Sequence, residues 1–295
     1  MFAGRFSEDV SVEYNKKDIG NVGRLDISII IINYNTFQLT CSCIESIYRL
    51  TTGVTFEVIL VDNASTEIDA SNFLKLFPQI KLAKSPLNKG FAGGNNLGIE
   101  LATADYILLL NSDTILVNNV PFVLKQFIEN HPRLAAVSGR LEYPNGRAQH
   151  NCQRFPSIRY KLFELLRLQK VFPKSFGGKV LMGAFFDHNS IAFPDWIWGT
   201  CFMFPRQLLM QLPNGKLADD FFMYGEDIQW CLEFRKRGYR IGFQPDARIV
   251  HLMGMSGAKK EEMVNKNGAT LMKMYYSGFH RYCLICLDCL LSFHF

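Results

Sequence analysis

The chain has 295 residues, of which 48% are hydrophobic and 20% are charged, values that are ordinary for a globular protein. Its formal net charge of +5 is too small a bias to indicate nucleic acid, although it suits an anionic ligand or a membrane surface. The N-terminal segment has scattered charges, and no segment reaches the roughly eighteen apolar residues of a membrane span, so we expect a cytoplasmic protein without a secretory signal.

The first half of the chain alternates apolar strands with helices. Residues 26–33 (DISIIIIN) and 56–61 (FEVILV) are continuous runs of apolar residues, typical of strands that are buried on both faces of a parallel sheet. The same criteria predict two further strands and four helices: strands at 80–83 and 106–110, and helices at 36–50, 65–77, 95–102 and 121–130. This alternation predicts an α/β fold, a doubly wound and mostly parallel sheet with helices on both faces.

The second half has a less regular pattern, and residues 170–195 give no clear prediction. Its expected elements are strands at 135–143, 149–155, 197–204, 239–243 and 248–252, and helices at 160–168 and 226–236.

Polar clusters follow four of the predicted strands: NYNT (33–36), DNAS (62–65), NKGFAGGNN (88–96) and NSD (111–113). Ligands of doubly wound sheets gather at the carboxyl ends of the strands, so we expect a binding site there. The first strand leads into NYNT rather than GxGxxG, which argues against a nicotinamide cofactor. Glycine and asparagine tolerate positive φ, so residues 88–96 form either a simple turn or a loop that lies against a ligand.

Five polar residues each allow a structural and a functional interpretation. Asp62 ends a strand and can accept hydrogen bonds from a nucleobase or a ribose, although dinucleotide-binding folds also place an acid there. Asp113 either caps a turn or holds a divalent cation whose other ligands are phosphates. Glu226 and Asp227 open a helix, where acids are favoured by the helix dipole, or one of them acts as a general base. His251 is either a core histidine or a metal ligand.

Seven motifs in chain order resemble those of bacterial family 2 glycosyltransferases, and most closely the rhamnosyltransferase-like enzymes of cell-surface polysaccharide assembly. They are NYN, VDNAS, NKGFAGGNN, LLLNSD, WIWGTCFMFPR, FFMYGEDIQWCLEFRKRG and VHLMG, within residues 26–254. The resemblance implies a GT-A fold, an inverting single displacement, a nucleotide-sugar donor and a divalent metal, Mg²⁺ or Mn²⁺. The implied domain covers 26–255, and it is divided into a nucleotide-binding half (26–133) and an acceptor and catalytic half (134–255). A polar leader (1–25) precedes it and a helical tail (256–295) follows.

The resemblance also implies roles for individual residues. Asp62 resembles the nucleoside-binding acid, and Asp113 the metal-binding end of a DxD-type motif, with His251 as a metal or diphosphate ligand. Asp227 resembles the catalytic base, with Glu226 beside it. Donor contacts are expected from Asn33, Asn35, Asp62, Asn63, Asn88, Gly90, Phe91, Gly93, Gly94, Asn95, Asn96 and Ser112. Acceptor contacts are expected from Trp196, Trp198, Gly199 and Tyr224, although the two tryptophans suit a protein core equally well.

Two positions depart from the family pattern. Asn111 stands where a strict DxD motif has aspartate, so fewer charges would hold the metal, and Gln229 stands where some relatives carry a second acid. The expected donor is dTDP-rhamnose or a UDP-sugar, and the expected acceptor is a saccharide or a polyprenyl-diphosphate-linked glycan. Two alternatives remain: a nucleotidyltransferase, which typically opens with a glycine-rich loop that NYNT lacks, and a catalytically silent nucleotide-sugar-binding protein.

The tail, residues 275–295, is the most apolar end of the chain. His280, Cys283, Cys286 and Cys289 recur at intervals of three, which indicates either a metal site or the apolar face of a helix, and the surrounding Leu and Ile favour the helix. Basic residues such as Arg281 lie close by. We therefore expect an interfacial helix that holds the protein at the inner face of the cytoplasmic membrane, near a lipid-linked acceptor.

Overall fold

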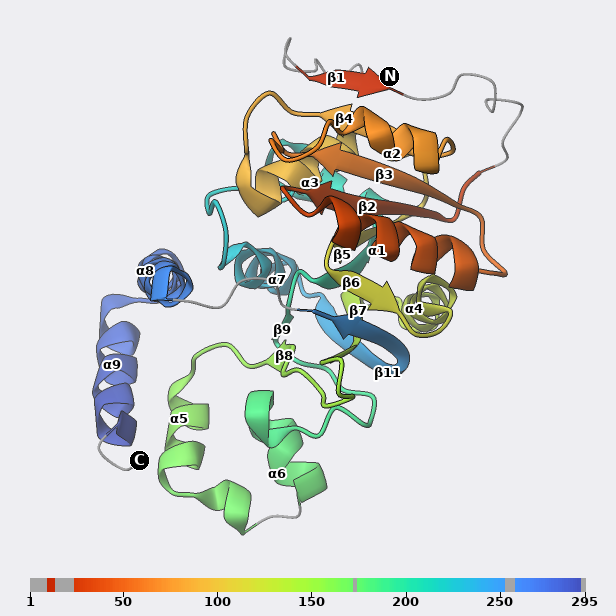
Figure 1. The fold of residues 1–295 in the computed structure, drawn as a ribbon. Coiled ribbons are helices and arrows are strands. Elements are labelled where there is room, and N and C mark those ends of the chain that lie inside the picture. The colour runs from red at the N-terminus through yellow and green to blue at the C-terminus, as the bar shows by residue number, and fades with distance from the viewer. Residues whose placement is uncertain (1–9, 14–23, 172–173, 253–257, 293–295) are drawn as a thin grey trace.

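A nine-stranded sheet forms the centre of the computed structural model, which describes residues 10–13, 24–171, 174–252 and 258–292 (Figure 1). The order of its strands is β1-β4-β3-β2-β5-β10-β7-β11-β6. These strands are β1 (Ser11–Glu13), β2 (Ile27–Asn33), β3 (Phe56–Asp62), β4 (Lys81–Lys84), β5 (Tyr106–Asn111), β6 (Thr114–Leu116), β7 (Leu134–Glu142), β10 (Cys201–Pro205) and β11 (Arg240–His251). A separate two-stranded sheet pairs β8 (Cys152–Gln153) with β9 (Trp196–Ile197).

Nine α-helices are present in the described part of the chain, together with short 3₁₀ helices at Leu168–Lys170 (η2), Gly183–Phe185 (η3), Arg206–Gln211 (η4) and Pro213–Gly215 (η5). They are α1 (Phe37–Leu50), α2 (Ser71–Leu76), α3 (Gly90–Leu101), α4 (Val120–Glu129), α5 (Ile158–Leu165), α6 (Lys174–Leu181), α7 (Glu226–Lys236), α8 (Ala258–Tyr275) and α9 (Gly278–Ser292).

The sheet is mainly parallel, as the sequence predicts. Strands β4, β3, β2 and β5 are parallel neighbours, and β11 is parallel to β7. Strand β10 runs antiparallel between β5 and β7, while β1 and β6 are antiparallel strands at the two edges. In β2 and β3 the register places Asn33 opposite Asp62, so two predicted site residues meet at the carboxyl end of the sheet.

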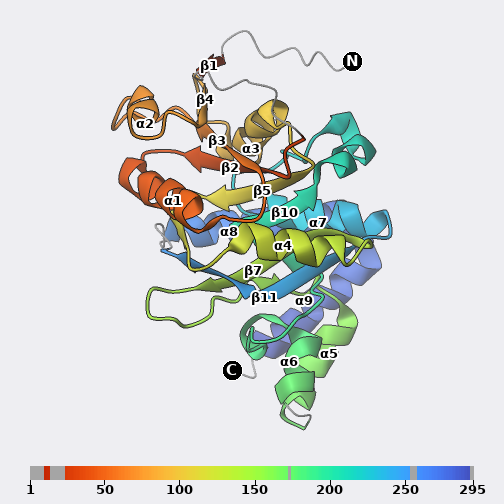
Figure 2. The same ribbon diagram turned by 90° about the vertical axis from the view of Figure 1, so that its right-hand side faces the viewer.

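Both faces of the sheet are buried, which explains the unbroken apolar runs in the sequence. Alternate residues of β2 serve opposite faces: Ile29 and Ile31 join the core beneath α1 and α4, while Ile30 joins the core beneath α3 and α7. Figure 2 shows α1 and α4 in front of the sheet and α7 behind it. The prediction of a doubly wound α/β fold with helices on both faces is confirmed.

The glycine- and asparagine-rich stretch is a helix and not a loop, so the prediction that helix begins at residue 95 was wrong. Helix α3 already begins at Gly90. A Cβ atom on Gly94 would lie 3.0 Å from the Ile32 side chain, and one on Gly98 would lie 2.4 Å from Ile30. Glycine is used here because it lets the helix lie directly on the sheet, a tertiary constraint that the local sequence does not reveal.

Other differences concern the lengths and breaks of elements. The helix expected at 65–77 is confined to α2, because backbone N–H groups at 65–67 donate to side chains of Asp62 and Asn35. The strand expected at 197–204 divides into β9 and β10 at the turn around Gly199. The strands expected at 239–243 and 248–252 form one strand, β11, with a register shift between Gln244 and Arg248. Of the strand expected at 149–155 only β8 forms, and β1, β6 and α6 were not predicted.

The C-terminal tail consists of two helices. Helix α8 packs near α7, where the Tyr275 hydroxyl lies 3.0 Å from Glu233, and α9 lies beside α5, where Lys161 pairs with Asp288 (Figure 1). The predicted boundary at residue 255 falls outside the described residues. Within the described chain, no helix is both long and apolar enough to cross a bilayer.

Candidate functional site

The carboxyl ends of β2 and β3 carry a fixed acceptor group. Asp62 is only 6% exposed, and its carboxylate accepts hydrogen bonds from the Asn33 side-chain amide (2.8 Å) and the Ser65 backbone N–H (3.3 Å). The same amide of Asn33 donates to the Ser65 hydroxyl (2.9 Å), and its oxygen accepts from Thr40 (3.0 Å). Because the partners sit at strand ends, in the turn that follows β3 and in the first turn of α1, this network is formed before any ligand arrives.

The segment that follows β2 is also connected to this network. Asn35 adopts a positive φ of 54°, and its side-chain oxygen accepts from the backbone N–H of Thr66 (2.8 Å). The hydroxyls of Thr36 and Ser112 lie 3.1 Å apart, which joins the segment after β2 to the segment after β5. Asn35 and Ser112, both predicted from sequence, therefore lie at the same edge of the sheet as Asp62.

Asn63 fixes the turn that leads into α3. Its side-chain N–H group donates to the Asn88 side chain (2.9 Å) and the Gly90 carbonyl (3.1 Å), and its oxygen accepts from the Lys89 N–H (2.9 Å). Gly90 has φ +73°, and a Cβ atom there would lie 2.2 Å from the Phe222 carbonyl oxygen. Only glycine fits this contact, which joins the start of α3 to the loop before α7.

Four other residues of this stretch have structural partners. The Phe91 N–H donates to the Phe222 carbonyl (2.8 Å), and the Asn95 amide donates to the Phe91 carbonyl (3.0 Å). Asn96 is buried and uses both ends of its amide on the backbone of Leu217 (2.9 and 3.1 Å). A Cβ atom on Gly93 would lie 2.9 Å from the Lys89 side chain. The Asn96 amide therefore holds α3 to the segment at 217, whereas the Asn95 amide bonds within α3, and donor contacts by these two residues stay a prediction.

The acidic pair Glu226 and Asp227 opens α7, and Glu226 is buried while Asp227 is half-buried. Asp227 accepts from the backbone N–H groups of Ile228 (2.8 Å) and Gly199 (3.2 Å). Burial raises the pKa of Asp227 to about 6, against the opposing effect of these two hydrogen bonds. Burial, and then the neighbouring Asp227 charge, raise the pKa of Glu226 to about 8. At neutral pH the pair therefore offers one carboxylate, Asp227, beside one protonated acid, Glu226.

The backbone just before this pair is held in a rare conformation. Tyr224 has φ +65° and Gly225 has φ +121°. The Asn267 side chain of α8 donates to the carbonyls of Met223 (2.8 Å) and Tyr224 (2.6 Å). A non-glycine residue at positive φ costs free energy and persists only where its surroundings enforce it, so Asn267 fixes the approach to the acidic pair.

Asp113 and His251 lie together where β6 and β11 pair. The His251 Nδ1 atom is 2.7 Å from the Gln149 side-chain oxygen, and the Gln149 amide donates to the His251 carbonyl (2.8 Å). Nδ1 is thus the donor, so the lone pair of Nε2 in a neutral ring faces an Asp113 oxygen at 3.4 Å. Two acceptors that face each other need a cation or a proton between them, and carboxylate plus imidazole suits Mn²⁺ or Mg²⁺.

Asp113 and Glu226 are close enough for both to influence Tyr224. The pKa of the Tyr224 hydroxyl is raised by burial first and then by the charges of Glu226 and Asp113. Among the described residues, no three acidic, histidine or cysteine side chains converge as a ready-made metal site. Asp113 and His251 could hold a cation only if a substrate supplied further ligands, such as phosphate oxygens.

The residues expected to contact the acceptor lie beside Asp227. Gly199 donates its N–H to Asp227, and a Cβ atom on Gly199 would lie 2.8 Å from the Phe91 ring. Trp196 is half-buried and donates its ring N–H to the Arg154 carbonyl (3.2 Å), while Trp198 packs against the opposite core. The two tryptophans therefore serve different faces of the sheet.

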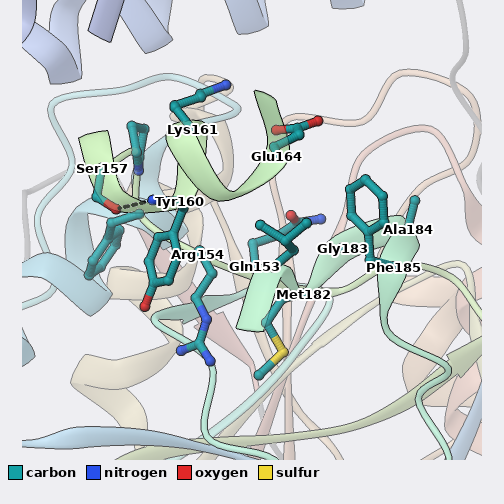
Figure 3. Close-up of a pocket in the computed structure, with 13 residues that line it drawn as sticks. Gln153, Arg154, Ser157, Tyr160, Lys161, Glu164, Met182, Gly183, Ala184 and Phe185 are labelled. Carbon is teal, nitrogen blue, oxygen red and sulfur yellow. Dashed lines mark hydrogen bonds between the residues drawn. The ribbon is translucent and has the colours of Figure 1, made fainter. Parts of the chain in front are cut away.

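A pocket of about 230 Å³ lies next to this segment (Figure 3). Its lining comes from α5, from β8 and from the turn at 181–185, and includes Gln153, Tyr160, Glu164, Met182 and Phe185. Gln153 pairs with Trp196 in the β8–β9 ladder, so the floor of the pocket continues into the strand that leads to Gly199. None of the site residues predicted from the sequence lines this pocket.

Four functional candidates were missed by sequence reasoning. Asn267, Gln149 and Ser65 act through hydrogen bonds to residues far away in the chain or in an irregular turn, and the Phe222 carbonyl acts through its backbone. A polar residue inside an otherwise unremarkable helix or strand carries no local signal of this kind.

This mainly parallel sheet, with Asn33 and Asp62 side by side at the carboxyl ends of its strands, has the fold of GT-A glycosyltransferases. Two solved structures share it: GalNAc-T7 with UDP, GalNAc and Mn²⁺ (TM-score 0.61, 14% identity, covering 86% of this chain and 49% of that one) and the mannosyltransferase PcManGT from Pyrobaculum calidifontis with GDP-Man and Mn²⁺ (TM-score 0.58, 18% identity, covering 92% and 75%).

The chain belongs to glycosyl transferase family 2, whose model matches residues 28–188. It is 28% identical over 224 residues to the low-salt glycan biosynthesis hexosyltransferase Agl10 of Haloferax volcanii, and 25% identical over 251 residues to the poly-beta-1,6-N-acetyl-D-glucosamine synthase of Staphylococcus aureus. These alignments cover 74% and 81% of this chain but only 64% and 53% of the two relatives. The chain thus spans less than two thirds of the length of either relative.

Proposed function

We propose that the protein is an inverting glycosyltransferase that moves a sugar from a nucleoside-diphosphate donor to a glycan acceptor in cell-surface polysaccharide synthesis. The observation that carries this proposal is Asp227, a half-buried carboxylate held by two backbone N–H groups beside the protonated Glu226. A dTDP-sugar such as dTDP-rhamnose, or a UDP-sugar, is the proposed donor. The two relatives are a hexosyltransferase and a poly-beta-1,6-N-acetyl-D-glucosamine synthase, so the choice of rhamnose depends on the sequence motifs alone.

The donor lies across the carboxyl ends of β2, β3 and β5 in this proposal. Asp62 is held in place by Asn33 and accepts hydrogen bonds from the nucleoside. The Asn63 turn and the start of α3 set the width of the site through Gly90, while Ser112 and Asp113 approach the diphosphate from β5.

Asp227 removes the proton of the attacking acceptor hydroxyl. Its pKa near 6 makes it a base that is mostly ionised at neutral pH and still able to take a proton. The acceptor oxygen then bonds to the anomeric carbon as the bond to the nucleoside diphosphate breaks, with inversion and without a covalent intermediate on the protein. Glu226 stays protonated, so it adds no second negative charge beside the base.

Asp113 and His251 would hold a divalent cation at the diphosphate. When bound, such a cation neutralises the charge that develops on the leaving group. Gln149 keeps the His251 ring in the tautomer whose Nε2 lone pair points toward Asp113.

The acceptor passes Gly199 and extends toward the pocket over β8. This route follows the β8–β9 ladder from Trp196 to Gln153 and reaches the Tyr160 and Phe185 rings, whose faces suit sugar rings. A polyprenyl-diphosphate-linked glycan at the inner face of the cytoplasmic membrane is the proposed form of this acceptor.

The test is a melting-temperature and calorimetry screen of the full chain against UDP-, dTDP- and GDP-sugars, with and without Mn²⁺, because a ligand of the native state raises the melting temperature by mass action. A hit is then assayed for donor hydrolysis and transfer. We expect Mn²⁺-dependent binding followed by turnover. Binding without turnover on any acceptor or water would favour the silent binding protein, and nucleotide release without sugar specificity would favour a nucleotidyltransferase.

A further inference from the structure

The outer face of α9 consists of six exposed side chains, none of them charged. They are Phe279, Tyr282, Ile285, Cys286, Cys289 and Leu290. Their spacing of three and four residues places them along one side of the helix. The opposite side carries the buried Leu284 and Leu291, so α9 already has a complete inner face and does not need its outer face to fold.

The degree of exposure marks this face as an interaction surface. The Phe279 side chain is 79% exposed and Tyr282 is 67% exposed. Single exposed apolar residues are common on proteins, but a contiguous row of them usually marks a binding surface. The neighbouring α5 carries exposed Leu162 in its middle, and Leu166 at its C-cap is 65% exposed.

The charges around the α9 outer face are mainly positive. Basic side chains on α5, η2, α8 and α9 are Arg159, Lys161, Arg167, Lys170, Lys273 and Arg281. The acids on the same segments are Glu164, Glu261, Glu262 and Asp288, and Asp288 pairs with Lys161 where α5 and α9 meet. An apolar row with a basic border matches an anionic lipid headgroup layer, whereas two copies of such a surface would repel each other.

The dimensions of α9 fit a position in the plane of a membrane surface. The helix has 15 residues. At about 1.5 Å per residue it is about 22 Å long, shorter than the roughly 30 Å needed to cross the hydrocarbon core. Figure 1 shows α9 at the outer edge of the molecule, beyond α5, where a flat surface can reach it.

We propose that the outer face of α9 binds the surface of an anionic lipid bilayer, with Phe279, Tyr282 and Ile285 in the headgroup region and the basic border on the phosphates. The proposal is independent of the sugar transferred. It goes beyond the proposed reaction, because it names the surface on which the protein works.

The experiment is flotation of the full chain with phosphatidylcholine vesicles that contain or lack phosphatidylglycerol. Wild-type protein should float with the anionic vesicles, and binding should weaken as salt rises. The double variant Phe279→Ser, Ile285→Ser should lose at least about 10-fold in vesicle partitioning, because two apolar contacts with the interface are removed. The matched control is Leu76→Ser on α2, which is 57% exposed and far from α9 in the chain, and it should float like the wild type.

Thermal melting checks that the variants are folded, which is expected because the substituted side chains are exposed. Light scattering measures the oligomeric state of the same samples. The proposal is overturned if wild-type protein ignores anionic vesicles at low salt, or if the double variant floats as well as the wild type. A wild-type dimer that the double variant converts to a monomer would assign this face to a second copy of the chain. Nucleotide binding measured on the same samples keeps this outcome separate from the test of the proposed reaction.

Discussion

The proposed donor side, at the ends of β2 and β3, and the proposed catalytic side, at Glu226 and Asp227, are built in different ways. At the ends of β2 and β3, Asn33, Asp62 and Ser65 satisfy one another over distances of 2.8–3.3 Å, and all three belong to adjacent strand ends and turns. On the catalytic side a Glu226 carboxyl oxygen is buried without a hydrogen-bond partner among the described residues, and the backbone before it has positive φ at two successive residues. Non-glycine residues with positive φ occur on both sides, at Asn35 and Ala64 after β2 and β3 and at Tyr224 before α7. The difference between the two sides is therefore the buried acid that lacks a hydrogen-bond partner on the catalytic side.

The two sides are therefore suited to different tasks, nucleotide binding and proton transfer. A satisfied network binds a ligand without rearranging, which suits a nucleotide that must be held in one orientation. A desolvated acid pair at a strained turn is unfavourable for the free protein but keeps a carboxylate basic enough to take a proton. The two sides meet where Gly90 contacts the Phe222 carbonyl and where Asn96 holds Leu217.

Removal of the divalent cation should have a large effect on chemistry, because a cation held by Asp113 and His251 would neutralise the charge of the leaving diphosphate. Excess EDTA is expected to lower the rate of transfer on the order of 10³-fold, since the leaving diphosphate loses its counter-charge. Addition of Mn²⁺ should restore the rate. Full activity in excess EDTA would remove Asp113 and His251 from the proposed mechanism.

A change on the donor side should alter binding and leave chemistry largely intact. Asp62→Ala removes the proposed acceptor of the nucleoside and one of the two partners of the buried Asn33 amide, so we expect donor affinity to fall about 10- to 100-fold in calorimetry. Asp69→Ala, at an exposed position before α2, is the matched control and should bind donor like the wild type. Unchanged donor affinity in Asp62→Ala would place the nucleotide elsewhere.

A change in the support of the catalytic side should alter chemistry and leave binding intact. Asn267→Asp replaces the N–H donors that hold the Met223 and Tyr224 carbonyls with a carboxylate, so kcat should fall on the order of 10-fold while donor affinity stays unchanged. Hydrogen exchange of residues 218–226 should become faster. Asn265→Asp, exposed on the same helix, is the control. Equal kcat in the two variants would mean that α8 does not position the acidic pair.

The smallest expected effect is on stability and depends on pH. The pKa of Glu226 in the folded protein is about 8, above its ordinary value of 4.5, so folding retains a proton that the unfolded chain releases between these values. This contribution to stability is complete below pH 4.5 and is lost as the pH rises through 8. Glu226→Gln cannot ionise, so it should melt above the wild type at pH 8, by about 2–4 °C for each kcal/mol of unfolding free energy that ionisation of Glu226 removes. The difference should be smaller at pH 5. Glu45→Gln, exposed on α1, should follow the wild type, and a Glu226→Gln difference that does not change with pH would contradict the buried-acid assignment.

The sequence predicted the donor side better than the catalytic side, for a physical reason. Strands buried on both faces leave an unbroken apolar signal, and the polar residue that ends each one, such as Asn33 or Asp62, is therefore easy to identify. The glycines of α3 also leave a clear signal, but their role depends on how closely the helix approaches Ile30 and Ile32, so a helix was taken for a loop. The contact of Asn267 with the loop at 223–224 spans more than forty residues and has no counterpart in the local sequence.

The central claim is that Asp227 is the base and Glu226 its protonated neighbour. The direct test compares kcat of Asp227→Asn and Glu226→Gln at saturating donor, after calorimetry has shown that both variants bind it. Asparagine caps a helix about as well as aspartate but cannot take a proton, so Asp227→Asn should lose on the order of 10²–10⁴ in kcat. Glutamine replaces an acid that is already neutral, so Glu226→Gln should stay within about 10-fold of the wild type. Near wild-type turnover by a folded, donor-binding Asp227→Asn variant, or a larger loss in Glu226→Gln, would contradict the assignment.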